Sequence, residues 1–392
     1  MEVAKVCFPG VGSVQPRHRI MSTFLSIALN AVAAVDEKAR ELHRKQYCAA
    51  GYCQTEPSPA EMLYAYLYGK PPPPVPVAPA RPYRGPPLSS AYIFTFIAVA
   101  LVILYRLQTK SSKRKTTGRF LPPPNTEKRE YEVWVLKYSI VWMGTFAIVI
   151  AFQLYELFDA SGYFLLCGGL ALPLLLQPLV YRTKRGKQQT SIGAQHAARA
   201  QVWVAVFGFI GNYWYTHYFY CVLRAKYTMP AWRLNDVPIA MYSATHFYFT
   251  SYHVLANLPL RHVRTSYQSG LLRDLLEWSL VLAMSYTTAF METLTISNFP
   301  YYDFEDRNMA YTVGSAFYAL YFVVSFPVYL RLDEEPTSTW TPSAWSNIAP
   351  LRDAAASALA SGMLVLMFLD LTRLAVVGTP LKIGGKLMEI TG

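Results

Sequence analysis

The dominant feature of this sequence is a succession of apolar runs, most of them about as long as the roughly 20 residues that cross the hydrocarbon core of a bilayer. Hydrophobic residues make up 53% of the 392-residue chain and charged residues 15%, against roughly 45–50% and 25% in soluble domains. A soluble chain would need a very large core to bury this surplus. The sequence therefore predicts an all-α, polytopic membrane helix bundle.

The runs predict seven core transmembrane helices and one further transmembrane helix on their N-terminal side. The further helix is the short run Ala91–Tyr105. The core helices are expected at Leu136–Phe158, Ser161–Tyr181, Val202–Leu223, Val237–Leu260, Leu275–Ile296, Met309–Leu330 and Ala354–Val377. Because no internal repeat and no strand periodicity is visible, polar groups within these segments must turn toward the interior of the bundle.

Composition divides the chain into four parts. Residues 1–90 form an N-terminal extension, expected to be largely disordered, which contains a proline-rich linker around Pro71–Pro74. Residues 91–130 hold the further transmembrane helix and a basic linker. Residues 131–377 are predicted to be the catalytic membrane domain, and residues 378–392 a C-terminal tail.

The formal net charge of +12 is distributed between the apolar runs and not along one soluble face, which excludes nucleic acid as a partner. Most of the Lys and Arg residues that lie between runs fall in alternate linkers, namely Arg106–Arg129, Arg182–Arg199, Arg261–Arg273 and Arg331–Arg352. By the positive-inside rule these linkers face the cytoplasm and the intervening short loops face the lumen.

Polar residues recur with helical spacing in the run Val237–Leu260. His246, Thr250, His253 and Asn257 follow one another at i, i+4, i+7 and i+11, which places them on one helix face. The two histidines stand about 10 Å apart along the helix axis, too far to bind one metal ion together. This stripe faces either neighbouring helices, through hydrogen bonds, or a ligand.

Glu292 is the sharpest catalytic candidate because it is a carboxyl group near the end of an apolar run, with Ser285, Thr288 and Thr295 on the same face. Desolvation disfavours the charged form of a carboxyl, so an enclosed glutamic acid can remain a proton donor at neutral pH. His217 shares a helix face with Tyr213 in the run Val202–Leu223 and is a second candidate for proton transfer.

Nothing in the sequence indicates a cofactor. Nucleotide-binding glycine motifs, zinc-protease motifs and haem motifs do not occur, and the five cysteines form no CxxC pair. The sequence therefore predicts no cofactor and no metal, and favours redox-neutral proton chemistry.

Several polar and aromatic stretches of the core are long and idiosyncratic. They include Gly211–Phe219, Glu292–Arg307, Tyr252-His253, Phe317–Ala319, Val324–Pro327 and Arg331–Glu334. In these stretches the chain resembles the cycloeucalenol cycloisomerase family, the plant and algal cyclopropyl sterol isomerases. The resemblance covers roughly Tyr131 to Val377. The region up to about Glu130 and the basic stretch Arg182–Arg199 depart from the family pattern, and Asp303 stands where a Glu is expected.

The resemblance implies an isomerase of phytosterol biosynthesis that opens the 9β,19-cyclopropane ring of cycloeucalenol to give the Δ8-sterol obtusifoliol. It implies a multi-pass protein of the endoplasmic reticulum membrane that takes its sterol from the bilayer and associates with other sterol-biosynthesis enzymes. The chemistry requires a proton delivered to C19 and loss of the proton on C8. Two alternatives remain open: a polytopic receptor or transporter, and a sterol-binding membrane protein without catalysis.

Within this reading Glu292 is the acid, and His217 or His246 is the base or a proton relay. Aromatic rings can stabilise the cation that develops during ring opening, and polar groups can orient the sterol. The residues expected to bind substrate are Asn212, Tyr213, His253, Asn257, Asn298, Tyr301, Tyr302 and Tyr318.

Overall fold

The computed structural model describes residues 87–109, 118–124, 126–182, 195–215, 225–297, 299–304, 307–332, 349–376, 381–383 and 386–388. Apart from Glu156–Phe158, they belong to one compact unit, Val77–Tyr155 and Asp159–Gly392. Nearly all of the predicted N-terminal extension, residues 1–90, lies outside the described residues.

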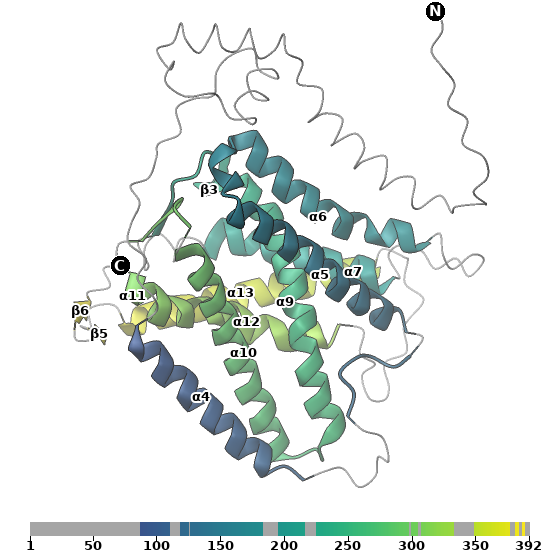
Figure 1. The fold of residues 1–392 in the computed structure, drawn as a ribbon. Coiled ribbons are helices and arrows are strands. Elements are labelled where there is room, and N and C mark those ends of the chain that lie inside the picture. The colour runs from purple at the N-terminus through teal and green to yellow at the C-terminus, as the bar shows by residue number, and fades with distance from the viewer. Residues whose placement is uncertain are drawn as a thin grey trace, which may run out of the picture. The chain divides into compact units, whose positions relative to one another are not determined.

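The described chain is mostly helical, which confirms the predicted all-α class (Figure 1). The long helices are α4 (Leu88–Arg106), α5 (Glu127–Ala151), α6 (Ala160–Arg182), α7 (His196–Ile210), α9 (Ile239–Ser266), α10 (Leu271–Ser297), α12 (Ser315–Leu330) and α13 (Ala349–Val376). Shorter turns of helix are η1 (Leu154–Leu157), η3 (Gly211–Tyr215), α11 (Arg307–Met309) and η4 (Ala310–Gly314).

Among the described helices, five segments are long and apolar enough to cross a membrane, so the protein is a multi-pass membrane protein. These segments are Leu88–Arg106, Glu127–Ala151, Ala160–Leu179, Arg307–Leu330 and Leu351–Ala375. Helices α9 and α10 have the necessary length, 28 and 27 residues, but contain more polar residues. The total of eight spans remains a prediction.

Some helix boundaries differ from the predicted ones because hydropathy does not mark polar helical turns. The span predicted at Leu136–Phe158 begins at Glu127 and ends at Ala151, with the Thr126 side chain capping its first turn. The span predicted from Val202 begins at His196 and changes at Gly211 into the π-turn η3. Its expected end, up to Leu223, lies outside the described residues.

Three short antiparallel strand pairs, which the sequence did not indicate, accompany the helices. Strand β1 (Ala225–Tyr227) pairs with β4 (Tyr302–Phe304), β2 (Arg233–Leu234) with β3 (Val237–Pro238), and β5 (Leu381–Ile383) with β6 (Lys386–Met388). Strands of two or three residues are too short to show a polar–apolar alternation.

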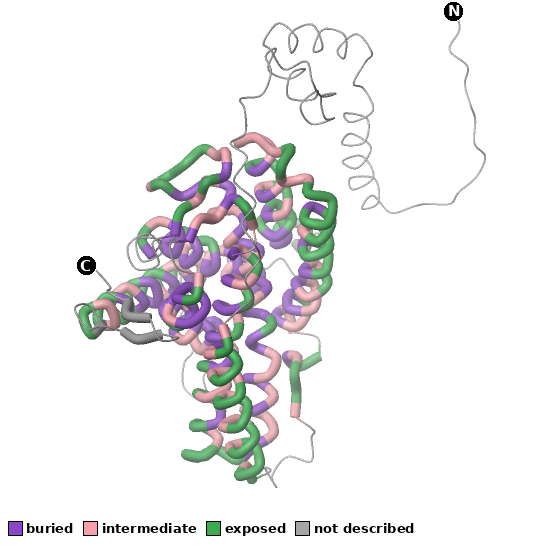
Figure 2. The backbone as a smooth tube through the Cα atoms, turned by 60° about the vertical axis from the view of Figure 1, so that its left-hand side comes forward, coloured by how far each residue is buried: buried purple, intermediate pink, exposed green. Residues whose placement is uncertain are grey.

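Helix α9 lies at the centre of the bundle, because it packs against α5, α6, α7, α10 and α12. Its stripe His246, Thr250, His253 and Asn257 is buried, as the shared-face prediction requires. Figure 2 shows that buried positions gather where the helices cross, and exposed positions on their outward sides.

Linkers predicted to share one side of the membrane also contact one another in space. At one end of the helices, Arg119 N donates to Thr265 Oγ1, and Lys128 reaches the C-terminal end of α12. At the opposite ends of these helices, β1 pairs with β4, which joins two of the predicted lumenal loops. These contacts agree with the predicted alternation of the linkers between the two sides of the membrane.

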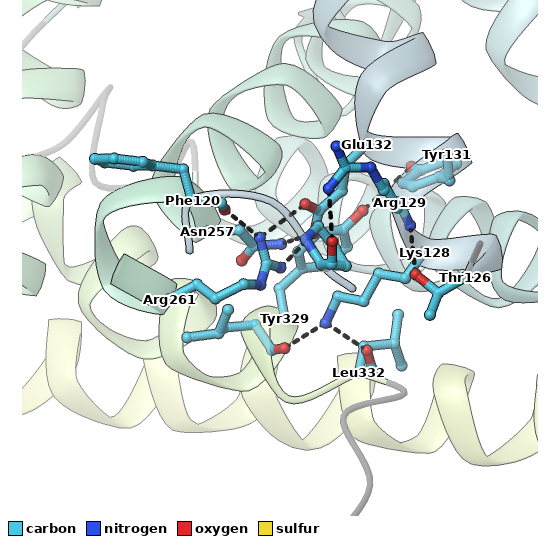
Figure 3. A network of polar contacts seen from close by, with 12 residues as sticks. Phe120, Thr126, Lys128, Arg129, Tyr131, Glu132, Asn257, Arg261, Tyr329 and Leu332 are labelled. Atoms are coloured by element: carbon cyan, nitrogen blue, oxygen red, sulfur yellow. Dashed lines mark hydrogen bonds and ion pairs between the residues drawn. The ribbon is translucent and has the colours of Figure 1, made fainter. Parts of the chain in front are cut away.

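A buried ion pair joins α5 to α9 near the basic ends of these helices (Figure 3). The Arg261 guanidinium donates to both carboxylate oxygens of Glu132, at 2.9 and 2.7 Å, and also to the Phe120 carbonyl at 2.7 Å. The Asn257 amide donates to the same carboxylate at 3.0 Å. Lys128, also buried, donates to the carbonyls of Leu330 and Leu332 and so holds the end of α12.

Replacing Arg261 by Met is expected to lower the free energy of unfolding by about 3–5 kcal/mol, because it leaves the Glu132 carboxylate buried without its partner. Arg373→Met is the matched control, since Arg373 pairs with Asp370 at 3.6 Å in an exposed position and its loss should cost about 1 kcal/mol or less. Denaturation of the detergent-solubilised protein measures both. Equal losses in the two variants would contradict the assigned importance of the buried pair.

Candidate active site

A large cavity lies inside the bundle, with a volume of about 1050 Å³. Its walls come from α4, α5, α6, α9, α10 and α12 and from the turn that carries Phe299 and Tyr302. Most of the wall is aliphatic or aromatic, and the volume is at the upper end of the roughly 300–1,000 Å³ of pockets that enclose small organic ligands. The cavity therefore suits a large apolar molecule.

Glu292 lies on the wall of this cavity, near the C-terminal end of α10. Among the residues that the structure describes, Glu292 provides the one carboxyl group on the cavity wall. No described His, Lys or Arg side chain lines the cavity. Thr288 and Thr295, predicted to share its face, line the cavity as well. The described part of the cavity thus holds a single acid in apolar surroundings.

Two phenols hold the Glu292 carboxyl group. The Tyr318 hydroxyl of α12 donates to Glu292 Oε2 at 2.8 Å, and the Tyr252 phenol of α9 lies close enough to interact with the same carboxyl group. Three helices therefore fix the position of this one group. A proton donor held in this way needs little reorganisation when its substrate is bound.

The predicted residues Tyr302 and Asn212 also lie on the cavity wall. Tyr302 belongs to strand β4, and its hydroxyl points to the Met241 sulfur at 3.4 Å. Burial raises the pKa of the Tyr302 phenol well above its usual range, so the phenol stays protonated. The Asn212 amide donates to the Gly208 carbonyl at 2.8 Å, within the turn from α7 to η3.

Close packing of α13 holds η3 in place. The Tyr215 hydroxyl at the end of η3 donates to the Gly362 carbonyl of α13. A Cβ atom at Gly362 would come within 2.9 Å of the Ile210 side chain, so a larger residue at this position would force that side chain to shift.

The structure places the histidines of α9 away from the cavity, in contacts between helices. The His246 Nε2 atom is 2.7 Å from Gln201 Oε1 of α7. His253 donates through Nδ1 to the Phe249 carbonyl, and its Nε2 is 2.8 Å from the Ser325 hydroxyl of α12. Asn257 belongs to the Glu132 ion pair. Of the two readings of this stripe, interhelical hydrogen bonding agrees with these contacts.

The remaining predicted residues divide into two groups. Neither Tyr213 nor Tyr301 lines the cavity: Tyr213 stacks on Phe209, and Tyr301 is buried against the wall residues Tyr155 and Tyr163. His217 and Asn298 lie outside the described residues.

Sequence reasoning missed the face of α9 that does line the cavity. This face carries Thr245, Tyr248, Tyr252 and Ala256, and the rings of Tyr248 and Tyr252 stack at 6.0 Å. Its spacing of i, i+3, i+7 and i+11 is helical, like the i, i+4, i+7 and i+11 spacing of the histidine stripe beside it, so a search for aromatic hydroxyls with helical spacing could have found it.

Comparison with known proteins gives one informative relative. The chain is 40% identical over 258 residues to cycloeucalenol cycloisomerase of Arabidopsis thaliana, which covers 64% of this chain and 87% of the relative. The chain belongs to the cycloeucalenol cycloisomerase family. This membership confirms the resemblance found in the sequence. No sequence model of a protein family matches the chain, and no solved structure matches it.

The contents of the cavity indicate which chemistry this member of the cycloeucalenol cycloisomerase family can perform. It presents a carboxyl group beside the phenols of Tyr252 and Tyr318, in a chamber with mostly apolar walls. Such a site can deliver a proton to an apolar substrate and protect a cationic intermediate from capture by water.

Proposed function

We propose that this protein is a sterol isomerase that opens the 9β,19-cyclopropane ring of cycloeucalenol and forms the Δ8-sterol obtusifoliol. The match to the Arabidopsis cycloisomerase over most of that protein's length is the observation that carries the proposal. The cavity supports it, because its size and apolar wall suit a sterol and its carboxyl group suits the chemistry.

The reaction requires one proton to be added and one to be lost. The neutral Glu292 carboxyl gives its proton to C19 as the C9–C19 bond breaks, and a tertiary cation develops at C9. Loss of the proton on C8 then supplies the electron pair of the Δ8 double bond. No net oxidation or reduction occurs, so the isomerisation balances without a cofactor.

Tyr252 and Tyr318 act as positioning residues, since their hydroxyl groups hold the Glu292 carboxyl against the cavity. The aromatic rings on the wall face the developing cation, and each can stabilise it by roughly 0.5–2 kcal/mol. Asn212, Tyr302 and Tyr318 are the predicted substrate-binding residues that the wall presents.

We assign the base that accepts the C8 proton to His217, because the other histidine candidate, His246, contacts Gln201 of α7 and does not line the cavity. His217 lies two residues after the end of η3 in the chain, and η3 contributes Asn212 and Tyr215 to the cavity wall. The predicted residues that do not line the cavity, Tyr213, His253, Asn257 and Tyr301, then act by packing and bonding between the elements that carry the wall.

We further propose that the protein works in the endoplasmic reticulum membrane, where it takes its sterol from the bilayer beside other enzymes of sterol biosynthesis. The apolar helices around the cavity support uptake from lipid.

Expression in a yeast strain supplied with cycloeucalenol tests the function. We expect mass spectrometry of the extracted sterols to show obtusifoliol, with no nucleotide or metal added to isolated microsomes. Unchanged cycloeucalenol in cells that contain the folded protein would overturn the proposal. Bound but unconverted sterol would identify a sterol-binding protein without catalysis.

Glu292→Gln should lower the turnover rate by about 10²–10⁴-fold, because the amide cannot supply the proton. Asp274→Asn is the control, since it makes the same change on an exposed part of the same helix. Tyr318→Phe keeps the acid but removes one hydrogen bond and should show an intermediate loss. Near wild-type turnover by Glu292→Gln would reassign the acid, first to His217.

Turnover in deuterated water follows the transferred proton. If Glu292 exchanges its proton with solvent between turnovers, one deuterium should appear at C19 of obtusifoliol. Product without deuterium would instead show that a single group carries the C8 proton to C19 within a sealed site, and would exclude His217 as a separate base.

A further inference from the structure

Helix α4 forms one wall of the cavity, although the sequence places it before the region that resembles the family. Phe94, Ile97, Ala98 and Leu101 line the cavity, and their spacing of i, i+3, i+4 and i+7 defines one face of the helix. The opposite face is exposed, with Ile103 55% accessible. One side of α4 therefore faces the cavity and the other faces lipid.

Contacts along its length hold α4 against α10 and the turn before it. The Phe94 ring packs on Phe290 at 4.9 Å and on Tyr286 at 5.6 Å. Near the other end of α4, the Gln108 amide donates to the Leu272 carbonyl at 2.9 Å, and Gln268 N donates to the Thr109 carbonyl at 3.1 Å. Helix α4 is thus a fixed part of this fold.

The two ends of the cavity differ in polarity. Glu292, Thr295, Tyr227 and Tyr302 bring polar groups to the end at which β1 pairs with β4. Towards the other end, the wall is formed by aliphatic side chains, among them Leu101 of α4 and Leu280 of α10. At roughly 1.5 Å per residue, Leu280 lies about 18 Å along the helix axis from Glu292.

This polarity orients an elongated sterol in the cavity. The reacting atoms C9 and C19 lie nearer to the 3-hydroxyl group of the sterol than to its alkyl side chain. With C19 at Glu292, the hydroxyl group faces the polar end and the alkyl side chain extends towards Leu280 and Leu101.

We propose that α4 binds the alkyl side chain of the sterol and determines which side chains the enzyme accepts, with Leu101 as the principal contact. The inference rests on the proposed function, because it takes the cavity as the sterol site. It also extends the sterol site beyond Tyr131–Val377, the region that resembles the family, because α4 precedes that region.

Leu101→Trp in the full-length protein tests this assignment, and Leu107→Trp is the matched control because Leu107 is 53% exposed. Two cyclopropyl sterols that differ only in side-chain length serve as substrates. We expect Leu101→Trp to lower turnover of the long-chain sterol at least tenfold relative to the short-chain one. The control should leave this ratio within twofold of wild type.

A change in the ratio distinguishes recognition from misfolding, since a structural defect would lower turnover of both sterols equally. Leu101→Ala provides a second variant, which should improve use of a sterol with a bulkier side chain. An unchanged ratio in both Leu101 variants would overturn the inference.

The affinity of each sterol can be measured by its competition with a radiolabelled sterol for binding. The ratio of the two affinities reports side-chain preference without turnover. A wild-type protein that binds sterols but converts none would overturn the proposed function, and the binding ratio would still decide the inference. A wild-type protein that binds no sterol would overturn both.

Discussion

The ion pair between Glu132 and Arg261 is the interaction on which the arrangement of the bundle depends. Two opposite charges buried among apolar helices are tolerated only in a geometry that satisfies both, so the pair permits one register of α5 against α9. Asn257 adds a hydrogen bond to the same carboxylate, and the Phe120 carbonyl accepts from the same guanidinium. This register also sets which residues of α9 face the cavity.

Helix α9 performs two tasks with two adjacent faces. The face with His246, His253 and Asn257 bonds to α7, α12 and α5, while the face with Tyr248 and Tyr252 is left to form the cavity wall. The polar side chains that looked most suited to chemistry hold the helices together. Of the two phenols beside Glu292, Tyr252 belongs to the less conspicuous face of α9, and Tyr318 belongs to α12.

The sequence was sufficient to predict the helical membrane class and to single out Glu292, which lies on the cavity wall, because a single carboxyl in an apolar run needs enclosed polar partners. It was not sufficient to separate the two faces of α9. A polar residue has the same hydropathy whether it bonds to another helix or contacts a ligand, so the sequence does not show which face lines the cavity. The early starts of α5 and α7 escaped prediction because their first turns are polar. The pairing of β1 with β4 depends on contacts between distant loops, which leave no periodic signal.

The position of α4 between the cavity and lipid has a consequence for binding energetics. A sterol that moves from the bilayer into this chamber exchanges one hydrocarbon environment for another, so the hydrophobic effect contributes little to its affinity. Selection must come from the shape of the chamber and from its few polar groups near Glu292. The relevant substrate concentration is accordingly the sterol's mole fraction in the membrane, and occupancy will follow the sterol content of the bilayer.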